Sequence, residues 1–123
     1  MGIMYHHAIV VTSSDEKLLD DAYEAASLVF SWVSPVSPQA VNGYRSFFIP
    51  PDGFKEGWQP SDEGDQRRQE FIDWMNTQTY SDGSSGLSWV EVGFGEYGYE
   101  VENNDHDYYL ERQAIADAEK NAH

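Results

Sequence analysis

The chain of 123 residues has no cysteine, few cations and no long apolar run. The lack of cysteine excludes disulfide scaffolds, thiolate metal sites and cysteine nucleophiles. No apolar stretch approaches the roughly 20 residues of a membrane span and no signal peptide is visible, so we expect a cytoplasmic protein that does not enter a membrane. Only 7 Lys and Arg oppose 22 Asp and Glu, which gives a formal net charge of −15. This charge repels nucleic acid and anionic membranes, so we expect direct binding to neither.

Aromatic residues are abundant in spite of the acidity. They make up 15% of the chain and hydrophobic residues 40%, which is too much for a wholly disordered acidic chain. The length fits one hydrophobic core and leaves no room for two. From residue 91 onward, 9 acids stand against 2 bases. We therefore predict one compact α+β domain over residues 1–95 and an acidic, partly helical tail over residues 96–123.

The spacing of apolar residues predicts two amphipathic helices and a small sheet. Alternation and β-branched residues favour strands, whereas apolar residues three and four positions apart favour helices. Strands are expected at residues 5–12, 42–50, 87–94 and 99–102, and residues 54–58 are expected to pair back as a short hairpin arm. Helices are expected at residues 15–30 and from residue 61 onward. This order predicts a two-layer sandwich of a mostly antiparallel sheet and two packed helices.

Serine residues are the expected N-caps of both helices. Ser13 or Ser14 precedes the first helix and Ser61 opens the second. A serine hydroxyl at this position accepts a hydrogen bond from a backbone N–H group of the first turn. The strand-to-helix turn at Ser13 also has free N–H groups that can hold a phosphate. Simple capping and phosphate binding are the two alternatives for this turn.

The few cations gather beside aromatic side chains in the block of residues 44–68. A guanidinium that pairs with phosphate and a ring that stacks on a base are typical of sites for an anionic, ring-bearing ligand. The candidate ligand site consists of Ser13, Tyr44, Arg45, Lys55, Trp58, Arg67 and Arg68. The alternative is that these cations form salt bridges with acids close in the sequence, such as Asp62 and Asp65. Arg67 and Arg68 are expected on the polar face of the second helix.

Carboxylates alternate with tyrosines after residue 91. Carboxylates spaced along the chain can occupy arginine and lysine pockets that are built for nucleic-acid phosphates, while tyrosines add contact area. The acids expected to form such a partner-binding surface are Glu96, Glu100, Glu102, Asp105 and Asp107. The alternative is a solvated acidic tail. The apolar side chains of this tail need cover that a neighbouring subunit would supply, so we expect a homo-oligomer; they are Tyr108, Tyr109, Leu110 and Ile115.

The histidines and the missing motifs argue against catalysis. His6 and His7 are adjacent on an expected strand, so they point to opposite faces and cannot chelate one metal ion together. One of them with nearby carboxylates would make a metal site, but one half-buried and one surface histidine is the simpler expectation. The sequence has no GxSxG, Walker or HExxH motif. We therefore expect no enzyme, no cofactor and no metal.

Four segments resemble a family of small acidic proteins that tailed bacteriophages and prophages encode. The segments are YHHAIVVTSS, VNGYRSFFIPPDGFKEGW, SDEGDQRRQEF and LSWVEVGF, and the resemblance covers roughly residues 5–94, most of the chain. The block around PDGxKEGW followed by SDxGDxxR is the most distinctive part. This chain has Phe54 where the family has serine after the PDG turn. The resemblance implies that the acidic tail beyond Glu96 is variable, which makes it a poor place for a shared function.

The resemblance implies a protein that counters host defence by stoichiometric binding in the infected bacterial cell. One version is a sponge for a nucleotide immune signal of the cyclic or ADP-ribose type, similar to the Thoeris anti-defence proteins. The other is an acidic mimic of DNA that blocks a CRISPR or restriction complex, similar to acidic anti-CRISPR proteins. The sponge is the leading hypothesis because the distinctive residues lie in the block 42–68. A structural or regulatory phage protein is the remaining alternative.

Overall fold

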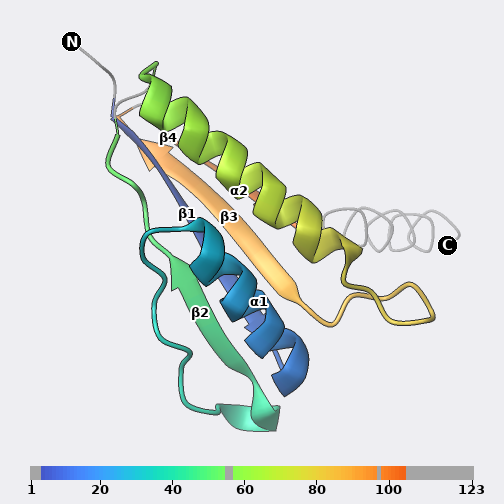
Figure 1. Cartoon of the computed structure of the whole chain (residues 1–123). Coiled ribbons are helices and arrows are strands. Elements are labelled where there is room, and N and C mark those ends of the chain that lie inside the picture. The colour runs from blue at the N-terminus through green and yellow to red at the C-terminus, as the bar shows by residue number, and fades with distance from the viewer. Residues whose placement is uncertain (1–3, 55–56, 97, 105–123) are drawn as a thin grey trace, which may run out of the picture.

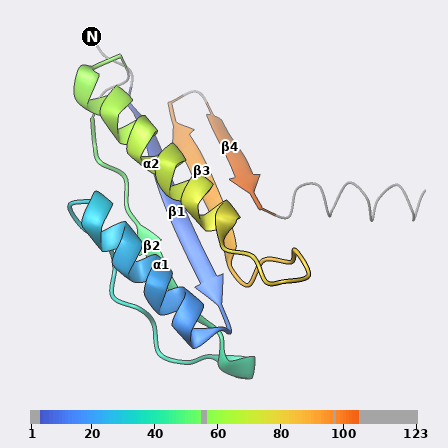
Figure 2. The same cartoon turned by 45° about the vertical axis from the view of Figure 1, so that its right-hand side comes forward.

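A computed structural model describes residues 4–54, 57–96 and 98–104 of the chain. The elements are β1 (Tyr5–Ser13), α1 (Glu16–Val29), a short 3-10 turn (Val41–Gly43), β2 (Arg45–Ile49), α2 (Gln59–Thr77), β3 (Ser88–Gly95) and β4 (Gly98–Asn103). The strands form one antiparallel sheet in the order β2-β1-β3-β4, and both helices pack on the same face of it (Figures 1 and 2). The expected α+β fold, with an antiparallel sheet and two packed helices, is confirmed. The expected helical tail lies outside the described residues from residue 105 onward.

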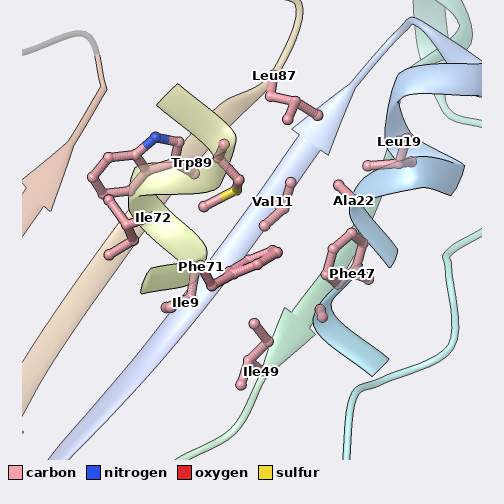
Figure 3. Packing of buried hydrophobic residues seen from close by; sticks show 12 residues of the cluster. Ile9, Val11, Leu19, Ala22, Phe47, Ile49, Phe71, Ile72, Leu87 and Trp89 are labelled. Atoms are coloured by element: carbon pink, nitrogen blue, oxygen red, sulfur yellow. The ribbon is translucent and has the colours of Figure 1, made fainter. Parts of the chain in front are cut away.

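The hydrophobic core lies between the two helices and the central strands. Ile9 of β1 is paired with Ile49 of β2 on one side and with Glu91 of β3 on the other. Because side chains alternate along a strand, the odd-numbered residues of β1, β2 and β3 face the helices. The buried apolar residues are Ile9, Val11, Leu19, Ala22, Ala26, Phe47, Ile49, Phe71, Ile72, Met75, Leu87 and Trp89 (Figure 3). The core therefore joins three strands to both helices.

The N-cap of α1 is Asp15, so the prediction of a serine cap is wrong. The Asp15 carboxylate accepts a hydrogen bond from the backbone N–H of Leu18 at 3.0 Å. Ser13 is the last residue of β1 and only 2% exposed, and its hydroxyl donates to the carbonyl of Gly86. That hydroxyl also accepts from the N–H of Asp15. Ser13 therefore ties the strand end to the loop before β3, which leaves the cap to the next carboxylate.

Helix α2 begins two residues before the predicted cap. Trp58 is at the N-cap position without a side-chain hydrogen bond to the helix, and Pro60 lies in the first turn, where its missing N–H costs nothing. Ser61 is inside the helix and 2% exposed, so the prediction that it caps α2 is wrong. Among the described residues of the segment 54–58, none forms the expected hairpin arm.

Strand β4 confirms the weak fourth strand that the sequence predicted at residues 99–102. It pairs with β3 through six residue pairs, among them Glu91 with Glu102 and Gly93 with Glu100. The sheet therefore continues past residue 95 to Asn103, and two of the predicted partner-binding acids belong to it. Within the described part of the chain, no helix is both long and apolar enough to cross a membrane.

Candidate functional site: an acidic groove

A groove of about 530 Å³ opens between α2 and the β3–β4 side of the sheet. It lies on the same face of the sheet as the hydrophobic core, at the end where β1 begins and β3 finishes. We call it the acidic groove, and its lining residues are Tyr5, His7, Asp65, Arg68, Gln69, Glu91, Gly93, Glu100 and Glu102. At this end of the strands, the helix-facing positions hold polar residues instead of the apolar residues of the core, and the groove forms there.

The register of the sheet brings the strand residues of the groove together. His7 is opposite Gly93, which is opposite Glu100, and Glu91 is opposite Glu102. Residues directly opposite one another in an antiparallel pair share a face with their side chains close together. Three strands therefore deliver a histidine and three carboxylates to one patch under the first turns of α2.

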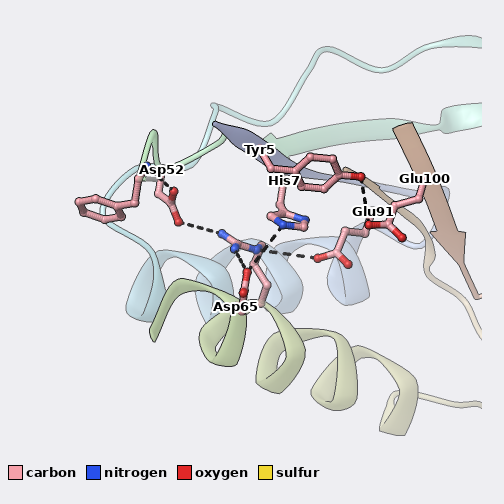
Figure 4. A network of polar contacts seen from close by, with 8 residues as sticks. Tyr5, His7, Asp52, Asp65, Glu91 and Glu100 are labelled. Carbon is pink, nitrogen blue, oxygen red and sulfur yellow. Dashed lines mark hydrogen bonds and ion pairs between the residues drawn. The ribbon is translucent and has the colours of Figure 1, made fainter. Parts of the chain in front are cut away.

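Gly93 forms the floor of the groove and lets the Tyr5 ring lie over it. A Cβ atom at Gly93 would lie only 2.8 Å from Cε1 of that ring. The Tyr5 hydroxyl donates a hydrogen bond to Oε1 of Glu100 at 3.0 Å (Figure 4). The missing side chain at one position thus fixes the ring, and the ring in turn orients a carboxylate on the edge strand.

Arg68 is the buried cation on the α2 side of the groove, and its residue is 5% exposed. Its Nη1 donates to Oδ2 of Asp52 at 3.1 Å and its Nη2 donates to Oδ1 of Asp65. Its Nε lies 4.0 Å from Oε2 of Glu91, and Nε2 of His7 lies 3.8 Å from Oδ1 of Asp65 (Figure 4). Carboxylates from a loop, a helix and a strand therefore surround one guanidinium.

The charge of the groove is negative in spite of Arg68. Four of its lining residues are carboxylates and one is a guanidinium, which leaves three formal negative charges with histidine neutral. Burial raises the pKa of the Glu91 carboxyl, and the neighbouring His7 and Arg68 offset only part of that effect. The nearby Glu102 raises the pKa of Glu91 further. The positive charge near Glu91 is thus too small to compensate for the burial of its ionised form. An added cation would stabilise that form.

An excess of carboxylates at an open groove favours ammonium and guanidinium ligands. Such groups form charge-assisted hydrogen bonds with carboxylates, which are about twice as strong as neutral ones. The same carboxylates would repel a phosphate group. Among the described residues, no group of three or more histidine and acidic side chains is arranged to hold a metal ion. The geometry therefore favours an organic cation as occupant.

Among the described residues of the predicted ligand site, only Arg67 and Arg68 line a common cavity. Ser13 and Arg45 lie away from the acidic groove, since Ser13 is bonded to Gly86 and Arg45 pairs with Glu16 at 3.1 Å. Tyr44 is 44% and Trp58 50% exposed, at separate places on the chain. Lys55 lies outside the described residues.

The two adjacent arginines of the predicted site, Arg67 and Arg68, both line a second cavity of about 260 Å³. The aromatic lining residues of this cavity are Phe30, Trp32 and Phe54. Arg68 is buried, so its predicted place on the polar face of α2 is wrong. The signal was in the sequence, because Arg68 precedes Phe71 by three residues and Met75 by seven, which is the spacing of the buried stripe.

Two of the five predicted partner-binding acids reach the acidic groove. Glu100 and Glu102 line it, whereas Glu96 lies in the turn between β3 and β4. Asp105 and Asp107 lie outside the described residues. The prediction that His6 and His7 point to opposite faces is confirmed, since His7 lines the groove and the His6 ring contacts the Phe94 ring at 5.3 Å between centroids.

Sequence reasoning missed Asp65 and Glu91 as groove residues. The signal for Glu91 was the strand alternation, which places it on the same face as the buried Leu87 and Trp89. A carboxylate that continues an apolar face needs a polar partner, and Arg68 is that partner. No comparable local signal pointed to Asp65, whose contacts come from β1 and from its own helix.

Comparisons with models of protein families, with curated proteins and with solved structures found no match. The resemblance to small phage proteins therefore stays a prediction. At about 530 Å³, the acidic groove has about twice the volume of the cavity beside Arg67.

Proposed function

We propose that this protein acts by stoichiometric binding and that the acidic groove captures arginine or lysine side chains of a nucleic-acid-binding protein. The single observation that carries the proposal is the convergence of four carboxylates on a groove whose one arginine is already held by acids. Carboxylate and phosphate offer guanidinium the same bidentate partner. A protein surface built to hold phosphates therefore fits this groove.

The phage resemblance suggests which partner this is. A nucleic-acid-binding subunit of a CRISPR or restriction complex has exposed cationic side chains, and covering them with carboxylates stops it from binding its target. Glu100 and Glu102 belong to the set that the sequence indicated as a mimic of a nucleic-acid backbone. The geometry favours this version over the nucleotide sponge, because Arg45 and Arg68 of the proposed sponge site already pair with carboxylates.

The double charge reversal Glu100→Lys with Glu102→Lys tests the proposal. The probe is an oligo-arginine peptide, and titration calorimetry measures its affinity at low and at physiological salt. We expect the variant to bind at least about tenfold more weakly, since each charge-assisted hydrogen bond contributes about 1.5–3 kcal/mol. The binding of the wild-type chain should weaken as salt rises.

The matched control reverses two exposed acids on α1, Asp20→Lys with Glu24→Lys, and so changes the net charge by the same amount. We expect the control to weaken binding by less than about threefold, because separated surface charges are largely screened at physiological salt. Equal losses in both variants would mean that only total charge matters, which contradicts a specific groove. Full affinity in the groove variant would contradict it as well.

A second candidate is a nucleotide in the cavity beside Arg67. No hydrogen bond or ion pair to another described residue engages this arginine, and the rings of Trp32 and Phe54 line the same cavity. A guanidinium for phosphate beside rings for a base is the pattern of a nucleotide site. Its volume of about 260 Å³ lies below the usual range of ligand pockets, so the cavity would enclose only part of a nucleotide.

Titration calorimetry with cyclic nucleotides and with ADP-ribose decides between the candidates. Heat with one of them that disappears in Arg67→Ala but persists in the Glu100 and Glu102 variant would establish the second candidate. The first candidate predicts the opposite pattern with the oligo-arginine peptide. Absence of heat with every nucleotide removes the sponge hypothesis.

A further inference from the structure

The sheet face opposite the helices is largely apolar, and its polar side chains include His6, Thr12, Ser46, Ser88 and Asn103. We call it the open face, and it consists of the even-numbered residues of β1, β2 and β3 and the odd-numbered residues of β4. None of these residues is Asp, Glu, Lys or Arg, although 24% of the chain is charged. Figures 1 and 2 show that neither α1 nor α2 lies over this face.

Large side chains on the open face are exposed. Phe48 is 39%, Phe94 42%, Tyr99 81% and Val101 52% exposed, and the Trp32 ring packs against Phe48 with 55% of its own surface exposed. An antiparallel sheet that faces water on one side normally presents polar residues there. A contiguous apolar patch on a soluble protein marks an interaction site.

We propose that two copies of the chain pack through their open faces, sheet against sheet, as a symmetric homodimer. In such an arrangement the same patch meets itself across a two-fold axis. Two twisted sheets that stack face to face cross at about 30° and are separated by about 10 Å of interdigitating side chains. The alternating rings and β-branched residues of the open face suit this packing.

The exposed area is sufficient for a dimer. With about 150–250 Å² for a whole aromatic side chain, the large exposed residues of the open face and Trp32 present on the order of 600 Å². Two such faces bury about 1,200 Å² together, which is the lower end of specific interfaces. Burial of the polar residues between them, such as Thr12 and Ser88, adds to this area.

Charge makes a second copy the best occupant. Two chains that each carry −15 repel one another wherever acids meet, and the open face lets them touch without placing like charges in contact. A cationic partner would find no counter-charge there, in contrast to the acidic groove. The dimer leaves both grooves on its outside, so a partner with two cationic sites would be bound twice and more tightly.

Sedimentation equilibrium of the full chain over a range of concentrations tests the dimer. We expect a dimer at micromolar concentration whose dissociation constant falls as salt rises, because salt screens the repulsion between the copies. This salt dependence is opposite to that expected for the groove and a cationic partner. Failure of one proposal therefore leaves the other standing.

The double variant Tyr99→Glu with Val101→Glu places four like charges in the interface of a dimer. We expect its association to weaken at least about 100-fold, because like charges in contact across an interface cost several kcal/mol. The matched control is Leu28→Glu with Val41→Glu, whose residues are 84% and 83% exposed and lie off the open face. The control adds the same charge and should remain a dimer. Circular dichroism checks that both variants fold.

Three outcomes would overturn the inference. A wild-type chain that is monomeric at high concentration and high salt would show that no second copy covers the open face. A dimer that survives Tyr99→Glu with Val101→Glu would place the interface elsewhere. Equal dissociation of the variant and of the Leu28 and Val41 control would attribute the loss to total charge.

Discussion

The two ends of the helix-covered side of the sheet share the same alternation of side chains but differ in polarity. At one end Val11, Leu87 and Trp89 face α2 and are buried. At the other end the same alternation places His7, Gly93 and other polar residues under the same helix. Backbone register thus delivers equivalent positions along a sheet, and residue type alone decides whether they become core or site.

The buried residues of α2 change from polar to apolar along the helix, as do the strand residues beneath them. Phe71 and Met75 face the apolar end, whereas Arg68 and Gly64 occupy the same stripe about one and two turns before Phe71 and face the polar end. Both kinds of residue are buried, so the stripe is continuous in burial but not in polarity. The two ends therefore stabilise the fold by different forces, and these forces respond differently to mutation and to pH.

The largest expected effects come from removing one buried side chain at each end. Arg68→Ala should lower the free energy of unfolding by about 3–5 kcal/mol, because it leaves several carboxylates around an empty position. Met75→Ala should lower it by about 2–5 kcal/mol through the cavity that remains. Urea denaturation at neutral pH measures both losses.

The pH dependence of these losses separates their causes. In Arg68→Ala the Glu91 carboxylate, whose pKa burial already raises, loses a nearby positive charge. Protonation of Glu91 removes this penalty, so the deficit should shrink as pH falls. The deficit of Met75→Ala should stay constant, because no charge is involved. An Arg68→Ala deficit that does not change between neutral and acidic pH would mean that packing, and not charge, holds the polar end.

A smaller effect is expected at Gly64, and its sign depends on a neighbour. Glycine inside a helix costs roughly 0.5–1 kcal/mol relative to alanine, so Gly64→Ala would ordinarily stabilise α2. A Cβ atom there would lie 2.5 Å from Oδ2 of Asp52, the oxygen that accepts from Arg68. We expect Gly64→Ala to destabilise the wild-type chain by about 1 kcal/mol, because it displaces this buried ion pair.

The double-mutant cycle with Asp52→Ala decides the cause of that effect. Without the Asp52 carboxylate the clash disappears, so Gly64→Ala should stabilise the Asp52→Ala chain by up to about 1 kcal/mol. The free energy of unfolding of all four chains gives the coupling. The same sign of effect in both backgrounds would show that the neighbouring Arg68 side chain, or the backbone, sets the constraint.

The sequence was sufficient for the elements and for much of the face pattern, because these depend on local periodicity. The alternation that placed Glu91 beside Leu87 and Trp89 held across the whole of β3. What local periodicity could not supply was the pairing of β1 with β3, which opposes residues about 80 positions apart. Without that pairing, His7 and Glu91 have no reason to meet.

The candidate site was predicted only in part, for a related reason. The sequence places Arg68 on the polar face of α2 because arginines are rarely buried. Its burial depends on Asp52, which comes from a loop sixteen residues earlier. Ser13 is a predicted cap because it lies just before the first helix, but its hydroxyl donates a hydrogen bond to the carbonyl of Gly86. In each case a distant group overrode a sound local preference.

The smallest expected effect compares one carboxylate from each end. Hydrogen bonds from the Tyr80 hydroxyl and from the N–H of Leu18 lower the pKa of Asp15 below its ordinary value of 3.8, whereas burial raises the pKa of Glu91 above 4.5. The ionised form of Asp15 therefore adds stability above pH 3.8, and this is lost as pH falls through the folded-state pKa. The protonated form of Glu91 adds stability below pH 4.5, and this is lost as pH rises through the folded-state pKa.

Asp15→Asn and Glu91→Gln should therefore shift the melting temperature in opposite directions as pH rises. Asparagine retains the helix cap but not the charge, so Asp15→Asn should melt like the wild-type chain at low pH and below it near neutrality. Glu91→Gln should gain relative to the wild-type chain over the same rise in pH, because a neutral amide avoids the burial of a charge. Differential scanning calorimetry at matched pH values measures both differences. If Glu91→Gln instead lost stability toward neutral pH, the attraction between Glu91 and Arg68 would outweigh burial, and the groove would have less unsatisfied negative charge for a cationic partner.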